Sequence, residues 1–385
     1  MLSFFALACG TAPAADSGVS PPQHLLLVSI DTLRVDHLEH APTLQRLADE
    51  GLVLRAHRSC ANWTAPAMIC ALTGQSGIDL GVDPRNAGAL RTTWSLPEHA
   101  ELLAEVLQAE GFATGLVTTN SLLARGNGLA RGYDTLESRP AAVAEDALDA
   151  TDALFVDAER RFVHVHLFDP HCPYAPPGSD DTLGSPYCMG EPSATSPSAE
   201  TVAELAADYV TEVAYLDLQL GRALERWGAA GWLDDTLTVV MSDHGEQLGE
   251  RAEIGHGLDV FAEETDALAI FAGVGGPDIE VPTQHQDLKP LILQHLGLLE
   301  GFEVRERPLL VASIDAESTV LALERESWLY RRGWDGSRAL YDRATDPEQL
   351  VDRRDDEPEL AAELEVAMED EVARLLAIYP EWEPE

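Results

Sequence analysis

Continuous apolar runs alternate with segments of helical spacing up to about residue 300. Residues 24–30 (HLLLVSI) form an unbroken apolar run that ends at Asp31, which is the pattern of a strand buried on both faces. Comparable runs cover residues 112–118, 161–168, 236–241 and 267–272, and helical spacing covers residues 42–50, 97–110 and 199–229. This alternation predicts an α/β fold, with a large and mainly parallel sheet flanked by helices on both faces.

The pattern changes near the C-terminus. Residues 308–332 read as short strands and residues 357–378 as one acidic amphipathic helix, so we expect a small C-terminal α+β subdomain over residues 301–385. The main domain is then residues 21–300. Within it, residues 172–198 are rich in Pro, Gly and Ser and predict a long surface loop.

The first 20 residues differ from the rest. An apolar run ends at Cys9 and is followed by small residues, as in a bacterial lipoprotein signal, although the usual preceding basic residues are absent. We expect residues 1–20 to be a lipoprotein signal and linker, with export to the periplasm or cell envelope and membrane attachment through a lipidated Cys9. The alternative is that residues 1–20 are a frayed N-terminal tail. No apolar run reaches the roughly 18 residues of a transmembrane helix.

Four further cysteines are Cys60, Cys70, Cys172 and Cys188, and they allow three pairings. Cys172 and Cys188 flank the Pro/Gly-rich loop, so we expect that pair. The alternative is that all four are small, reduced core residues.

The charge balance excludes one class of partner. The chain has 67 acidic and 25 basic residues and a formal charge of -42. Nucleic-acid binding depends on Lys and Arg that neutralise phosphates, so we expect no nucleic-acid partner. The bases are nearly all arginine, and Lys289 is the only lysine.

Polar residues follow three of the predicted strands: Asp31, Asp169-Pro170-His171 and Asp243-His244. Open α/β sheets bind ligands at the carboxyl ends of their strands, so these residues are candidates for a shared site. A single Asp after a strand is more often a turn or cap residue. Three such positions in one chain, two of them with His, favour a site.

The segment Asn62-Trp63-Thr64-Ala65-Pro66 precedes an apolar run and predicts a helix start. Thr64 could be the helix N-cap that satisfies free backbone amides. The same position lies in the positive potential of the helix N-terminus, where an alkoxide or a bound oxyanion is stabilised.

Several motifs together resemble the sulfatase family of the alkaline phosphatase superfamily, in family order and over residues 24–350. They are Leu-Val-Ser-Ile-Asp-Thr-Leu-Arg (27–34), Trp-Thr-Ala-Pro (63–66) with Leu-Thr-Gly (72–74), His-Leu-Phe-Asp-Pro-His-Cys-Pro-Tyr (166–174), Ser-Asp-His-Gly-Glu (242–246), Gly-His-Gly (255–257), and Ala-Leu-Tyr-Asp (339–342) with Asp346-Pro347. The resemblance implies that residues 21–300 are a sulfatase-like catalytic domain.

The resemblance also implies roles for individual residues. Asp31, Asp243, His244 and the Thr64 oxygen would hold a metal, and Thr64 stands where the family has its nucleophile. His171 and His256 would act on the anionic group or the leaving group. We expect His166, Asn120 and Arg34 to bind substrate. The alternative for His166 is a structural role, as a buried histidine whose ring nitrogens are hydrogen-bonded within the core.

The departures from the family pattern are informative. Thr64 replaces the cysteine that sulfatases convert to formylglycine, Met68 replaces an arginine, and Lys289 lies outside every motif. Thr32 and His244 replace an aspartate and an asparagine of the family's metal site. These changes favour a threonine alkoxide that attacks sulfur or phosphorus and forms a covalent ester, which water then cleaves.

Two carboxylates, an imidazole and a hydroxyl favour one Zn²⁺ or Mn²⁺, with Ca²⁺ as the alternative. A second metal at Asp169, His171 and His256 is a further alternative. With Met68 in place of an arginine and no lysine in the motifs, the predicted site has little positive charge. This favours a substrate whose reacting sulfur or phosphorus group carries one negative charge, in a small-molecule, glycan or lipid ester. Two other functions remain open: transfer of a phospho or sulfo headgroup to an alcohol, and an inactive sulfatase-like binding protein.

Overall fold

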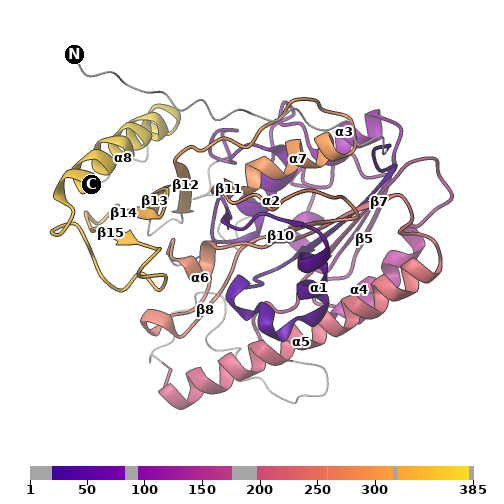
Figure 1. The fold of residues 1–385 in the computed structure, drawn as a ribbon, viewed down its shortest axis with the longest axis horizontal. Coiled ribbons are helices and arrows are strands. Elements are labelled where there is room, and N and C mark those ends of the chain that lie inside the picture. The colour runs from indigo at the N-terminus through magenta and orange to yellow at the C-terminus, as the bar shows by residue number, and fades with distance from the viewer. Residues whose placement is uncertain (1–19, 83–93, 176–196, 258, 315–318, 381–385) are drawn as a thin grey trace.

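A seven-stranded sheet forms the centre of the computed structural model, which describes residues 20–82, 94–175, 197–257, 259–314 and 319–380 (Figure 1). The strand order is β2-β10-β7-β1-β6-β4-β5. The strands are β1 (His24–Ile30), β2 (Leu52–Val53), β4 (Ala113–Thr118), β5 (Thr135–Ser138), β6 (Arg161–Leu167), β7 (Thr236–Ser242) and β10 (Ala269–Ala272). Strands β7, β1, β6, β4 and β5 pair in parallel, and β10 is antiparallel to both of its neighbours. The predicted α/β fold is confirmed.

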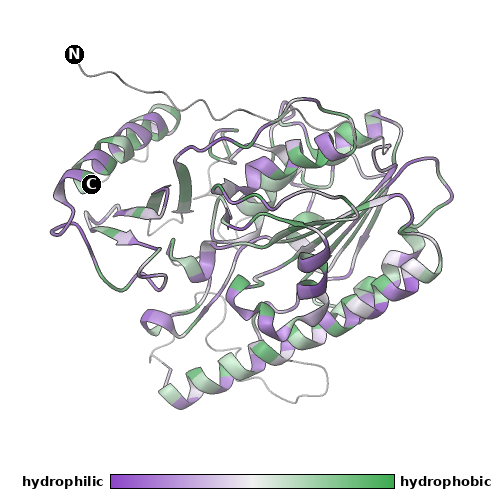
Figure 2. Ribbon diagram, in the orientation of Figure 1, coloured by the Kyte–Doolittle hydropathy of each residue, from purple (hydrophilic) through white to green (hydrophobic). Residues whose placement is uncertain are grey.

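Helices cover both faces of this sheet because successive strand residues point to opposite sides. Leu25 and Leu27 of β1 belong to one buried cluster, and Leu26 and Val28 belong to another. The first cluster includes residues of α2 (Thr64–Thr73), α3 (Leu103–Ala109) and α7 (Leu288–His295), and the second includes residues of α1 (Pro42–Glu50), α4 (Ala144–Thr151) and α5 (Ala199–Ala229). The central strands are correspondingly mainly hydrophobic, whereas α5 has mixed faces (Figure 2).

The C-terminal part is a four-stranded antiparallel sheet with one helix against it. Its elements are β12 (Leu309–Ile314), β13 (Thr319–Arg325), β14 (Trp328–Gly333), β15 (Arg338–Asp342) and α8 (Pro358–Ile378). Leu364 and Met368 of α8 pack with Leu321 and Tyr330 of the sheet. Smaller elements are β3 (His57–Arg58) paired with β11 (Thr283–Gln284), β8 (Gln247–Leu248) paired with β9 (Ile254–Gly255), and α6 (Ala262–Thr265).

One predicted helix begins later than expected. The helix predicted over residues 97–110 begins at Leu103, and residues 97–100 form a turn closed by Ala100 N–H donating to Pro97 O at 3.0 Å. The guanidinium of Arg131 donates to the carbonyls of Pro97 and Ala100. These carbonyls are therefore used by a side chain instead of a helical ladder.

The cysteine expectations have mixed outcomes. Cys60 and Cys70 form a disulfide with a Cα–Cα distance of 6.4 Å, and Cys172 is also disulfide-bonded. The alternative of four reduced thiols is therefore wrong. Cys188 lies outside the described residues, so its pairing with Cys172 stays a prediction. Residues 1–19, with Cys9, and most of the predicted loop, 176–196, also lie outside them.

None of the helices in the described ranges combines the length and the hydropathy required to cross a bilayer.

Candidate active site

Two neighbouring strand ends bring three candidate metal-ligating side chains together. Asp31 follows β1 and Asp243-His244 follow β7, and the register pairs Ile30 with Ser242. His244 Nε2 lies 3.6 Å from Asp31 Oδ1 and 3.6 Å from Asp243 Oδ2. Gly245 permits the tight turn that follows, because a Cβ there would lie 2.0 Å from the Glu263 carbonyl oxygen.

The three ligand atoms fit a divalent cation. All three side chains are fully buried, and Asp31 Oδ1, Asp243 Oδ2 and His244 Nε2 have no hydrogen-bond partner among the described residues. Buried polar atoms without partners are costly, and a shared cation would satisfy all three. In the part of the chain that the structure describes, this is the only group of three or more His, Cys and acidic side chains close enough to hold one ion. Within the described residues, Asp169, His171 and His256 form no second group of this kind, so the alternative of a second metal there is not supported.

The hydroxyl of Thr64 lies at the edge of this group. Trp63 is the N-cap residue of α2 and Thr64 is the first helical residue, so the N-cap interpretation of Thr64 is wrong. Thr64 Oγ1 lies 3.5 Å from Asp31 Oδ2 and accepts from Asn120 Nδ2 at 3.3 Å. Asn120 also donates to Asp31 Oδ2 at 2.7 Å. The structure thus brings Thr64 and Asn120 to the predicted metal ligands.

Three further histidines surround the group. His166 Nε2 lies 3.4 Å from Asp31 Oδ2. The His256 ring centroid lies 4.5 Å from that of His244 and 4.9 Å from that of His171. His171 Nδ1 contacts the Cys172 carbonyl, and His256 Nδ1 contacts Glu246 Oε1 at 2.7 Å. Because both contacts use Nδ1, neither of them engages the Nε2 atom of its ring.

Burial and neighbouring charges shift the pKa values of these side chains in different directions. Burial alone would raise the pKa of Asp31, but the imidazoles of His171 and His166 hold it below its usual value. Burial and the Asp31 charge raise the pKa of Asp243. Burial lowers the pKa of His244, as a metal-binding imidazole requires. Burial opposes protonation of His256, but the Glu246 carboxylate raises its pKa overall.

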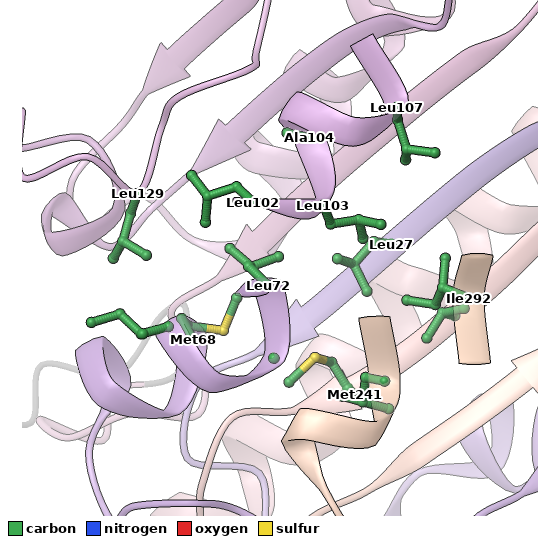
Figure 3. Packing of buried hydrophobic residues seen from close by; sticks show 14 of the residues in the cluster. Leu27, Met68, Leu72, Leu102, Leu103, Ala104, Leu107, Leu129, Met241 and Ile292 are labelled. Carbon is green, nitrogen blue, oxygen red and sulfur yellow. The ribbon is translucent and has the colours of Figure 1, made fainter. Parts of the chain in front are cut away.

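The cationic side chains of Arg34 and Lys289 are engaged away from the three candidate ligand atoms. Arg34 donates to Asp36, to Glu250 and to the Glu246 carbonyl, and in the described ranges none of its hydrogen bonds reaches Asp31, Thr64 or Asp243. Lys289 Nζ donates to the Glu101 carbonyl at 2.7 Å. Met68 is fully buried and lies among hydrophobic side chains (Figure 3), including Leu72, Leu102, Leu103 and Leu129.

Sequence reasoning missed several polar residues of the site. Glu246 stood inside a quoted motif but received no role. Ser29 also stood inside a quoted motif without a role, and His285 lies outside every motif. Only the structure shows that Ser29 Oγ contacts His166 Nδ1 at 2.8 Å and that His285 Nε2 donates to the Asp243 carbonyl at 2.7 Å. An alternating pattern on β6 could have paired His164 with His166, because residues two apart share a face of a strand.

Comparisons with known proteins agree on one family. A family profile described as Sulfatase matches residues 23–298. The chain is 26% identical over 298 residues to the low-salt glycan biosynthesis sulfotransferase Agl7 of Haloferax volcanii, covering 74% of this chain and 64% of that protein. The chain therefore spans less than two thirds of the length of this curated relative.

Two solved structures share the fold. The phosphonate monoester hydrolase SpPMH from Silicibacter pomeroyi is 20% identical, with a TM-score of 0.71, over 91% of this chain and 95% of that one. The 2-O GAG sulfatase BT1596 is 15% identical, with a TM-score of 0.77, over 94% of each chain.

Proposed function

Because this chain belongs to the sulfatase family, we propose that it is a metal-dependent hydrolase of sulfate or phosphorus esters with Thr64 as its nucleophile. The proposal rests on the proximity of a group of candidate metal ligands to the Thr64 hydroxyl. Three unpartnered ligand atoms on Asp31, Asp243 and His244 face one another, and Thr64 Oγ1 lies 3.5 Å from Asp31 Oδ2. A metal site and an alcohol nucleophile therefore adjoin.

Asp31, Asp243 and His244 would hold one divalent cation, with the Thr64 oxygen as a fourth donor. Their mixed oxygen and nitrogen set favours Zn²⁺ or Mn²⁺ over Ca²⁺. Such an ion lowers the pKa of bound water to about 7, and a bound alcohol should respond in the same sense.

Thr64 and the histidines would then perform two displacements. The deprotonated Thr64 oxygen bonds to sulfur or phosphorus while the bond to the leaving oxygen breaks, and that oxygen takes a proton from His256 or His171. Water then attacks the sulfur or phosphorus of the Thr64 ester and returns a proton to the histidine. The bond to the Thr64 oxygen breaks, which releases sulfate, a phosphate monoester or a phosphonate according to the substrate. The pKa of His256, raised by Glu246, supports its role as the acid.

The distribution of cations supports a monoanionic reacting group. Arg34 and Lys289 are engaged by other groups, and Met68 is a core side chain. A sulfate ester, a phosphodiester or a phosphonate monoester brings one negative charge to this site, whereas a phosphate monoester brings two. We therefore propose an anionic ester of the first kind, with a small-molecule, glycan or lipid leaving group.

A metal assay combined with an ester panel tests the function. Wild type, Thr64→Ala and Thr64→Ser would be compared on p-nitrophenyl sulfate, bis-p-nitrophenyl phosphate and p-nitrophenyl phosphate. We expect one equivalent of metal, turnover of the monoanionic esters, retained activity in the serine variant and loss in the alanine variant. Full activity of Thr64→Ala would refute the nucleophile, and preference for the phosphate monoester would refute the charge argument.

Transfer to an alcohol is the second candidate. The similarity to a sulfotransferase supports it, since a covalent group on Thr64 could pass to an alcohol in place of water. Product analysis with an added alcohol acceptor separates the two reactions. Metal binding without turnover in either assay would leave the inactive binding protein.

We also propose an envelope location with lipidation at Cys9. The disulfides at Cys60–Cys70 and at Cys172 support an oxidising compartment. Metabolic labelling with a fatty acid, lost in Cys9→Ser, would test the anchor.

A further inference from the structure

A chain of hydrogen-bonded polar side chains runs from His166 of β6 to the hydroxyl of Tyr133. Ser29 of β1 and His166 of β6 are register partners, and Ser29 Oγ lies 2.8 Å from His166 Nδ1. The same oxygen lies 2.9 Å from His164 Nε2. His164 Nδ1 lies 2.6 Å from the hydroxyl of Tyr133, at the end of the chain. Ser29, His164 and His166 are fully buried.

We propose that Ser29, His164 and Tyr133 are positioning residues that hold His166 with its proton on Nε2, directed at Asp31 and the reacting group. The catalytic consequence rests on the proposed function, whereas the position of the proton does not. His166 is thereby a hydrogen-bond donor in the site and not a base.

The direction of the hydrogen bonds follows from the two ends of the chain. Asp31 at one end is a carboxylate that only accepts, which favours a proton on His166 Nε2. His166 Nδ1 must then accept from the Ser29 hydroxyl, and Ser29 Oγ accepts from His164 Nε2–H. His164 Nδ1 is left to accept from Tyr133 O–H. In this direction each of the three contacts from His166 Nδ1 to the Tyr133 hydroxyl has one donor and one acceptor.

The reverse direction fails at the site. A proton on His166 Nδ1 would leave the Nε2 lone pair facing the Asp31 carboxylate at 3.4 Å, which is repulsive. Burial lowers the pKa of His164 well below its usual value, so the imidazole is neutral and keeps one donor and one acceptor.

His166 Nε2 itself remains open. It is buried and lacks a well-aligned hydrogen-bond partner, although Asp31 Oδ2 is close. An N–H in this position can donate to an oxygen of an anionic ester or to the Thr64 oxygen as charge develops there. The rest of the chain then serves to keep this donor in place.

Nitrogen NMR of ¹⁵N-histidine-labelled protein, loaded with Zn²⁺, tests the tautomer directly. We expect His166 and His164 both to carry the proton on Nε2 at neutral pH, with assignments from His166→Gln and His164→Gln. A proton on His166 Nδ1, or on both nitrogens, would overturn the proposal. If the tautomer is as expected but no ester is cleaved, the proposed function fails and this assignment stands.

A double-mutant cycle tests the role of the chain in turnover. Ser29→Ala should lower kcat/KM about 10- to 100-fold, as loss of supporting residues does at metal sites, while Ser29→Thr keeps the hydroxyl and most of the activity. Tyr133→Phe should lower kcat/KM only when Ser29 is present. Wild-type kcat/KM in Ser29→Ala, or an equal effect of Tyr133→Phe in both backgrounds, would overturn the proposal.

Discussion

Asn120 Nδ2 donates to Asp31 Oδ2 at 2.7 Å and leaves Asp31 Oδ1 facing His244 Nε2. The carboxylate therefore has two different oxygens. One accepts from an amide beside Thr64, and the other has no hydrogen-bond partner within the described ranges. Asn120 in turn is fixed by its own Oδ1, which accepts from Leu122 N–H at 2.9 Å.

Asn120→Ala should release the Asp31 carboxylate and weaken the metal site. We expect the metal dissociation constant to rise about 10-fold and kcat/KM to fall by about 10- to 100-fold, because supporting hydrogen bonds orient ligands. Titration of metal-free protein with Zn²⁺ against a chelating dye would measure the first effect. Ser121→Ala, on the neighbouring position, is the control. Unchanged metal affinity in Asn120→Ala would show that the amide acts only on substrate.

A second support lies beneath Asp243. His285 Nε2 donates to the Asp243 carbonyl, and His285 Nδ1 lies 2.9 Å from His57 Nε2. Burial lowers the pKa of His285 to about 4, so the ring is neutral.

His285→Leu should leave the Asp243 carbonyl without its donor and raise the metal dissociation constant about 10-fold. His285→Gln places an amide N–H near the Nε2 position and should restore most of the affinity. The same dye competition measures both variants, with thermal unfolding of the metal-free protein as the check on folding. Equal affinity in the two variants would refute a role for this hydrogen bond.

Local pattern predicted the fold well because the central strands are mainly apolar and alternate with segments of helical spacing. Asp31 and Asp243-His244 were predictable for a related reason, since parallel strand ends meet at one edge of a sheet. Ser29 and His285 were not, because their roles depend on which residues face them across strands β1 and β6 or across a loop. Arg34 has the right sequence position, but Asp36 and Glu250 engage its guanidinium, and no local pattern reveals such long-range pairs.

Glu324 should be essential for the attachment of the C-terminal sheet. Its carboxylate accepts from Arg58 of β3 at 2.8 Å and from Arg343 at 2.7 Å, and it is 2% exposed. Removing one partner of a buried ion pair leaves uncompensated charge, so Glu324→Gln should lower the free energy of unfolding by about 3 kcal/mol. Urea unfolding measures this, with the exposed Glu326→Gln as the matched control. Equal stability of the two variants would contradict the inference.

Glu212 of α5 should make stability depend on pH. Burial, followed by the charge of Asp169, raises the pKa of Glu212 from 4.5 to about 8. The folded protein therefore holds this proton more tightly than the unfolded chain does. Its stabilising contribution is complete below about pH 4.5 and is lost as the pH rises through about 8.

Glu212→Gln has no such proton, so its stability relative to wild type should increase between these two pH values. Urea unfolding of both proteins across the range measures the difference. Parallel stability curves would mean that Glu212 is ionised in the folded protein.

Rapid-quench mass spectrometry would detect the covalent ester on Thr64. Metal-loaded protein mixed with a sulfate ester or phosphodiester would be quenched in acid, digested and mapped. We expect a sulfo or phospho adduct on the peptide that contains Thr64, formed at a rate that supports turnover and absent in Thr64→Ala. Turnover with no adduct at any time, or an adduct on a different residue, would contradict this expectation.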